Sequence, residues 1–255
     1  MNATPVNRFK QALREKRAQI GFWLTLGDPT SAEICASAGF DWLLIDGEHV
    51  PHSLHSVLDQ VRVIDGYPST QAVARVASAD PVVIKQSLDL GVQSLLVPMV
   101  ESAEEAESIV AACRYPPAGN RGIGGARAAR WGHIPKYLHD SNEQIAIIVQ
   151  VESQAGLANL DEIIRTEGID GVFIGLADLS ASLGYLGQPG HPEVQRLTMD
   201  AFTRISVVGK APGILVRDQT LAHKYLDYGA LMVAVGLDAH LLAAETKGLI
   251  GTFKK

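Results

Sequence analysis

Short apolar runs of strand length recur along the whole chain, and each is followed by turn residues and a longer stretch with helical spacing. Most of these runs are continuously apolar rather than alternating, which is typical of strands buried on both faces of a parallel sheet. The pattern therefore argues against a β-sandwich. Eight such runs predict strands at residues 20–24, 42–46, 72–76, 94–98, 145–151, 171–175, 211–216 and 231–235.

Capping residues mark where the intervening helices begin and end. Asp or Ser at the N-cap with Pro in the first turn suits the free amides of a helix start, and Gly suits a left-handed C-cap. The start signals are Asp28-Pro29, Asp80-Pro81, Ser102 and His191-Pro192, and the stop signals are Gly39, Gly91, Gly168 and Gly229. Helices are predicted at residues 31–38, 82–90, 103–113 and 134–142, with a long helix after Pro192.

Eight alternations of strand and helix in a chain of this length predict the α/β class and a closed (β/α)8 TIM barrel. An additional helix at residues 6–14 is expected to cap the base of the barrel. No Pro-, Gly- or Ser-rich linker divides the chain. Residues 1–255 are therefore predicted to form a single domain.

Composition narrows the classes of function. The chain has 255 residues, with 22 basic and 28 acidic side chains and a net charge of −6, and no basic cluster suited to nucleic acid. Residues 1–16 carry charges throughout and have no apolar core of signal-peptide length, and no later apolar stretch approaches the length of a membrane span. Cys35 and Cys113 are isolated, which argues against a disulfide framework. We expect a cytoplasmic protein that binds neither nucleic acid nor membranes.

In a barrel of this kind the active site lies on the loops that leave the carboxyl ends of the strands. Glu152 ends the fifth predicted strand and Asp178 follows the sixth, so both carboxylates can converge on one ion. Two carboxylates with open positions suit a hard cation such as Mg²⁺ or Mn²⁺. The alternative is that each caps a following helix.

Two further side chains at strand ends have a chemical and a structural interpretation. His49 ends the second strand, where an imidazole can serve as a general base, or it is a surface histidine. Pro51 is expected to open a helix that places His52 and His55, solvated, in its first turn. Arg75 ends an otherwise apolar strand and needs an anionic partner, either a substrate group or Asp46.

Several segments in the same order resemble the 4-hydroxy-2-oxoheptanedioate aldolase family, the HpcH/HpaI-type, metal-dependent class II pyruvate aldolases. The resemblance runs from about the first strand to the last helix. The segments that carry it are residues 42–49, 96–100, 114–122, 149–152 and 174–180, among them Asp46-Gly47-Glu48-His49 and Gly175-Leu176-Ala177-Asp178-Leu179-Ser180.

The resemblance implies a barrel of the phosphoenolpyruvate/pyruvate superfamily, assembled as a hexamer with the last helix exchanged between subunits. It implies a divalent cation, Mg²⁺, Mn²⁺ or Co²⁺, on Glu152 and Asp178. It also implies a catalytic base at His49 that pairs with Asp89. Arg75 matches the arginine that polarises the substrate.

Other positions match residues that surround the substrate in this family. Asp46 and Gln150 match positions that hold water or orient the inner groups, and Gln150 is expected to contact substrate. Backbone amides near Ala177 and Asp178 are expected to hold the pyruvate carboxylate. The family usually has proline where Leu176 stands, which bears on substrate preference at that loop.

The implied reaction is cleavage of a 4-hydroxy-2-oxo acid, such as 4-hydroxy-2-oxoheptanedioate or a 2-keto-3-deoxy sugar acid, to pyruvate and an aldehyde through a metal-stabilised pyruvate enolate. Contacts to the distal end of the substrate are expected from residues 121–130 or from a neighbouring subunit. One alternative is another lyase of the superfamily that acts on an acyl-CoA or phosphoenolpyruvate-like substrate, with Arg75, Arg121, Arg127 and Arg130 as its anion site. A non-catalytic metal-binding scaffold is the other.

Overall fold

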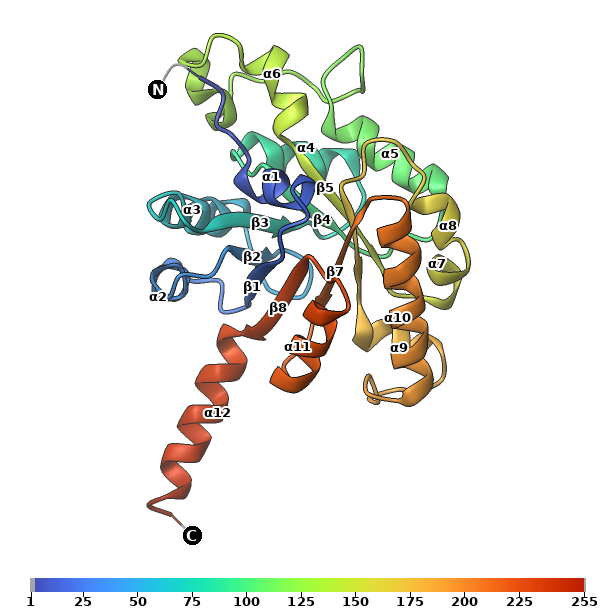
Figure 1. Cartoon of the computed structure of the whole chain (residues 1–255). Coiled ribbons are helices and arrows are strands. Elements are labelled where there is room, and N and C mark those ends of the chain that lie inside the picture. The colour runs from blue at the N-terminus through green and yellow to red at the C-terminus, as the bar shows by residue number, and fades with distance from the viewer. Residues whose placement is uncertain (1–2, 255) are drawn as a thin grey trace.

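The computed structural model describes residues 3–254, and in them eight parallel strands close into a barrel in sequence order, with β1 pairing β8 (Figure 1). This confirms the predicted (β/α)8 fold. The strands are β1 (Gln19–Leu24), β2 (Trp42–Asp46), β3 (Gln71–Arg75), β4 (Ser94–Val97), β5 (Ala146–Val151), β6 (Gly171–Ile174), β7 (Ala211–Leu215) and β8 (Met232–Leu237).

The helices follow the strands as the capping signals predict. Three of the predicted N-cap side chains accept hydrogen bonds from backbone amides in the first turn of a helix, namely those of Asp28, Asp80 and Ser102. The helices are α1 (Arg8–Arg14), α2 (Pro29–Ser37), α3 (Leu54–Ile64), α4 (Pro81–Asp89), α5 (Ala103–Cys113), α6 (Tyr137–Gln144), α7 (Gln154–Ala158), α8 (Leu160–Ile163), α9 (Leu176–Ser182), α10 (Pro192–Val207), α11 (Gln219–Asp227) and α12 (Asp238–Gly251), with a 3₁₀ helix, η1, at Arg127–Gly132.

The helix α1 closes the base of the barrel, as expected from the sequence. Its Phe9 and Leu13 are buried in the same apolar cluster as Trp42 and Phe173, which point into the barrel. The rings of Phe9 and Trp42 meet edge to face with their centroids 5.9 Å apart. A packed interior leaves the strand ends opposite this base as the place for polar chemistry.

The expectation that Pro51 opens a helix is wrong. Helix α3 begins at Leu54, because Ser53 and Ser56 form a reciprocal capping box that fixes the start. His52 therefore precedes the helix, is half-buried, and has its Nδ1 atom 3.0 Å from Ser56 Oγ. Burial lowers the pKa of His52.

The last helix, α12, projects away from the barrel (Figure 1). Its first residue anchors it to β1, because Asp238 Oδ1 accepts hydrogen bonds from Thr25 N at 2.7 Å and Thr25 Oγ1 at 2.8 Å. Most of its remaining length is exposed. In the part of the chain that the structure describes, no helix has the length and apolar character needed to cross a membrane.

Candidate active site

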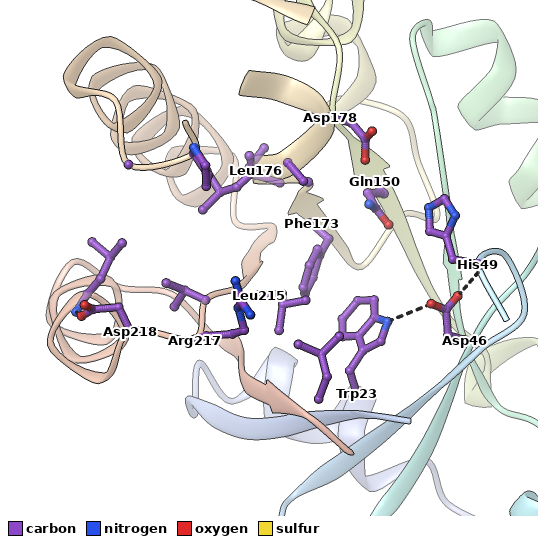
Figure 2. Close-up of a pocket in the computed structure, with 18 of the residues that line it drawn as sticks. Trp23, Asp46, His49, Gln150, Phe173, Leu176, Asp178, Leu215, Arg217 and Asp218 are labelled. Atoms are coloured by element: carbon purple, nitrogen blue, oxygen red, sulfur yellow. Dashed lines mark hydrogen bonds between the residues drawn. The ribbon is translucent and has the colours of Figure 1, made fainter. Parts of the chain in front are cut away.

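A cavity of about 990 Å³ opens where the carboxyl ends of the strands meet (Figure 2). Most of the site residues predicted from the sequence lie on its wall. Those residues are Asp46, His49, Arg75, Gln150, Ala177 and Asp178, and Leu176 lines it with them. The carboxyl ends of the strands therefore bring together side chains that are far apart in the sequence.

Arg75 ends β3 with its guanidinium locked between two acidic side chains. Its Nε and Nη2 atoms donate to the two carboxylate oxygens of Asp46 at 2.9 and 2.6 Å, and Nη1 pairs with Glu48 Oε2 at 2.9 Å. The ring of Trp23 lies 5.2 Å from the guanidinium carbon. Of the two partners that the sequence allowed for Arg75, a substrate group or Asp46, Asp46 is the one bound in this structure. Arg75 also lines the cavity, where it can contact a substrate.

Asp46 stays ionised because of this arrangement. Burial by itself would raise the pKa of Asp46, but the hydrogen bonds and charge of Arg75 outweigh it. Backbone amides of Glu48 and His49 also donate to Asp46 Oδ1, at 3.0 and 3.3 Å. The pKa of Asp46 is therefore held below its usual value.

Glu152 lies directly behind the wall of the cavity and is only 3% exposed. Its Oε1 accepts a hydrogen bond from Met99 N at 3.0 Å, and its Oε2 accepts one from Gln150 Nε2. Burial, helped by the charges of Asp178 and Glu48, raises the pKa of Glu152 to about 7. Among residues 3–254 no Lys or Arg forms an ion pair with it.

Helix capping does not account for Glu152, because Ser153 provides the side-chain cap of α7. Asp178 lies in the first turn of α9, whose N-cap residue is Gly175. A methyl group at position 175 would lie 2.2 Å from Glu152 Oε2, so only glycine lets the loop after β6 lie against this carboxylate.

The donor set fits a hard divalent cation. A buried carboxylate with a raised pKa, beside a second carboxylate, is relieved of its unfavourable charge when a cation binds. The described residues contain no group of three or more His, Cys, Asp or Glu side chains that could hold a metal ion. The protein would therefore supply Glu152 and Asp178, and substrate and water oxygens would fill the remaining positions, as Mg²⁺ commonly requires.

His49 lies at the rim of the cavity, with its side chain 65% exposed. Its Nε2 atom is 3.7 Å from Glu48 Oε2, and its backbone amide donates to Asp46. Glu48 thus contacts both Arg75 and His49, a role that sequence reasoning missed. The position of Glu48 between Asp46 and His49 in the sequence indicates that it lies near the site. The sequence does not indicate in which direction its side chain points.

Within one chain, the structure does not bring Asp89 to His49. Asp89 is the last residue of α4, which runs back toward the start of β4, and it does not line the cavity. Its Oδ1 accepts a hydrogen bond from Arg121 Nη2 at 2.8 Å. Arg127 and Arg130 also lie outside the cavity and pair with the carboxylate of Asp65. Arg121 is thus paired with Asp89, while Arg127 and Arg130 share the single carboxylate of Asp65.

Comparison with known proteins agrees with this geometry. Residues 19–244 match the sequence profile described as HpcH/HpaI aldolase/citrate lyase. A 4-hydroxy-2-oxovalerate aldolase of Rhodococcus jostii (strain RHA1) is 60% identical over 250 residues, which cover 98% of this chain and 97% of that protein. A hydroxypyruvate/pyruvate aldolase of Pseudomonas aeruginosa is 56% identical over 252 residues, covering 98% and 94%.

A solved structure gives the same result at the level of the fold. The crystal structure of an HpcH/HpaI aldolase/citrate lyase family protein from Burkholderia cenocepacia J2315 superimposes with a TM-score of 0.94 at 36% identity, covering 98% of this chain and all of that one. The match extends over the barrel and its site together. This chain belongs to the HpcH/HpaI aldolase/citrate lyase family and is an aldolase, a lyase that cleaves carbon–carbon bonds.

Proposed function

We propose that the protein cleaves 4-hydroxy-2-oxo acids to pyruvate and an aldehyde in a reaction that depends on a divalent cation. The observation that carries the proposal is that Glu152, buried and without a cationic partner among the described residues, lies just behind the wall of the cavity that a fixed Arg75 lines. A carboxylate pair for a cation and an arginine for a developing negative charge are the parts that an enolate-forming reaction needs.

The cation would be held by Glu152 and Asp178, and Mg²⁺, Mn²⁺ and Co²⁺ all suit such ligands. When bound, it would supply Lewis acidity at the 2-oxo group of the substrate. Arg75 would donate charge-assisted hydrogen bonds to the same oxygen as negative charge develops there. Since Asp46 and Glu48 already hold its guanidinium in place, little reorganisation is needed at that moment.

His49 would act as the base. Its imidazole at the rim of the cavity would take the proton of the 4-hydroxyl group while the C3–C4 bond breaks, leaving the aldehyde and the enolate of pyruvate. The enolate then takes up a proton at C3 from solvent water and His49 releases its proton to solvent, which gives the methyl group of pyruvate and restores the base. Glu48, with its Oε2 atom 3.7 Å from Nε2 of His49, would help to orient the imidazole.

The pyruvate carboxylate would be bound at the loop after β6. Ala177 lies in the first turn of α9, where backbone amides have no partner within the helix, and it lines the cavity. Gln150 lines the cavity beside this turn and donates to Glu152, which orients both side chains. Leu176, unlike proline, retains its backbone N–H at the first position of this helix.

Replacing His49 tests the assigned chemistry. We expect His49→Ala to lower kcat for pyruvate release from 4-hydroxy-2-oxoheptanedioate by about 10²- to 10⁴-fold, the usual contribution of a general base. The matched control is His55→Ala, since His55 is exposed on α3 and does not line the cavity. Full cleavage activity in folded His49→Ala would contradict the proposal.

The same proposal includes a homohexamer in which α12 packs on a neighbouring subunit. Support comes from the apolar side chains that α12 and the residues after it leave exposed, namely Leu241, Leu242, Leu249, Ile250 and Phe253. We also propose the cytoplasm as its location. Cys35 and Cys113 are both free thiols, which fits a reducing compartment.

A further inference from the structure

Two cationic side chains besides Arg75 line the cavity. Arg217 follows β7 directly, and Lys224 is on α11. Figure 2 shows Arg217 beside Leu215, across the cavity from His49. Neither residue has a part in the chemistry proposed for Arg75, Glu152 and His49.

Arg217 differs from Arg75 in having no carboxylate partner among the described residues. Its Nη1 atom lies 3.1 and 3.2 Å from the two ring nitrogens of His240, a neutral partner in the unprotonated form. Within residues 3–254 neither Arg217 nor Lys224 forms an ion pair with a carboxylate, and Nε and Nη2 of Arg217 have no hydrogen-bond partner. The neighbouring Asp218 is occupied as the cap of α11, where it accepts from Leu221 N at 2.8 Å.

The surface between the two ends of the cavity is apolar. Trp23, Phe173 and Leu215 line it between Asp46, the partner of Arg75, and Arg217 (Figure 2). A chain of methylene groups would lie favourably along such a surface, whereas a hydroxyl-rich chain would lose hydrogen bonds to water there. The cavity volume of about 990 Å³ is within the range of ligand pockets and exceeds what a pyruvate unit alone would fill.

We propose that Arg217, assisted by Lys224, is the specificity-determining residue that binds a carboxylate at the distal end of the aldehyde portion of the substrate. This inference rests on the proposed function, because the reacting end must lie at Glu152, Asp178 and Arg75. An acceptor with a short aliphatic chain and a terminal carboxylate would then extend across the apolar surface to the guanidinium. The two free donors of Arg217 suit the two oxygens of that carboxylate.

The test compares two acceptors that differ in one group. Succinic semialdehyde carries a carboxylate where butanal carries a methyl group, and each is added to saturating pyruvate with wild-type protein and variants. We expect Arg217→Ala to lower kcat/KM for succinic semialdehyde by about ten- to hundredfold, the value of a charged hydrogen bond, with less than about a threefold change for butanal. Arg217→Lys should recover part of the loss, and Lys224→Ala should show a smaller loss.

The controls separate this inference from the function on which it rests. Arg62→Ala removes an exposed arginine of α3 outside the cavity, so kcat/KM should be unchanged for both acceptors. Exchange of the pyruvate methyl protons with deuterated solvent requires no aldehyde, so its absence from wild-type protein would defeat the proposed function and this inference with it. If exchange proceeds but Arg217→Ala affects both acceptors equally, or neither, the assignment of Arg217 is overturned while the proposed function stands.

Discussion

At the scale of single residues, the position of Arg75 depends most on Asp46. The guanidinium and the carboxylate are both buried, and they share two hydrogen bonds of 2.9 and 2.6 Å. Removing Asp46 would leave the buried guanidinium of Arg75 with Glu48 as its one carboxylate partner, and breaking a buried pair in this way costs more than the pair itself contributes. The fixed geometry of Arg75 is therefore tied to the stability of the fold.

We predict that Asp46→Asn lowers the free energy of unfolding by about 3 kcal/mol at pH 7. The pKa of Asp46 is lowered in the folded state, so its contribution is present above the unfolded value near pH 4 and is lost as the pH falls through the folded value. Urea unfolding at pH 7 and at pH 3 should show a smaller difference between wild type and variant at pH 3.

An equal difference at both pH values would contradict this assignment. The matched control is Asp59→Asn, because Asp59 forms an exposed pair with Arg62 one turn away on α3. A pair of that kind contributes about 0.5 kcal/mol or less, so the control should unfold nearly as the wild type does.

At the scale of elements, the junction between β6 and α9 fixes the positions of Glu152 and Asp178, the two carboxylates that we propose as metal ligands. Gly175 is the N-cap residue of α9 and packs against Glu152 of the neighbouring strand. The added methyl group of Gly175→Ala would meet Glu152 Oε2 at 2.2 Å and its Cβ at 2.7 Å. Neither contact is possible without moving the strand end or the carboxylate.

We predict that Gly175→Ala destabilises the protein by about 1–3 kcal/mol and weakens metal-dependent activity at the same time. Thermal unfolding and pyruvate release measure the two effects. Gly125→Ala is the control, because a methyl group at position 125 meets nothing within 4 Å. If Gly175→Ala unfolds at the same temperature as the wild type and releases pyruvate at the same rate, the junction tolerates a side chain and the prediction is wrong.

Sequence patterns predict the elements well where local chemistry fixes them. The run at residues 42–46 became β2 with the same ends, and Gly39, Gly91, Gly168 and Gly229 have the positive φ angles of C-caps. The helix expected at residues 134–142 instead spans Tyr137–Gln144, within a long connection that has few capping signals. Pro51 was a misleading signal because the serines that follow it cap the helix better.

Side-chain contacts between elements were less predictable than the elements themselves. The strand order brings Asp46 opposite Arg75 in the β2–β3 register, so that pair could be named as an alternative from the sequence. The contacts of Glu48 with Arg75 and of Asp89 with Arg121 depend on how loops fold back, which no local pattern records. The contacts that these side chains make could therefore be identified only from the three-dimensional structure.

At the scale of the whole molecule, α12 stands out because most of its length does not pack against the barrel. It extends from β8 into solvent in the single chain (Figure 1), and Leu242 is 56% exposed on it. An exposed apolar helix of this kind is stabilised when a second copy of the chain covers it. The geometry therefore favours an assembly in which subunits share this helix.

We predict that wild-type protein sediments as a hexamer and that Leu242→Asp shifts it to smaller species, because a buried charge without a partner disfavours the contact. Analytical ultracentrifugation measures the distribution. Glu245→Gln, a polar change on the same helix, should leave the hexamer intact. Monomeric wild-type protein at micromolar concentration would contradict the assembly.

The proposed cleavage reaction depends on a divalent cation. Pyruvate release from 4-hydroxy-2-oxoheptanedioate, coupled to lactate dehydrogenase, measures it most directly when the protein is first stripped with a chelator and then freed of it. We predict no cleavage above background in the stripped protein and recovery on addition of Mn²⁺, Mg²⁺ or Co²⁺. Full activity in the metal-free protein would contradict the role of Glu152 and Asp178.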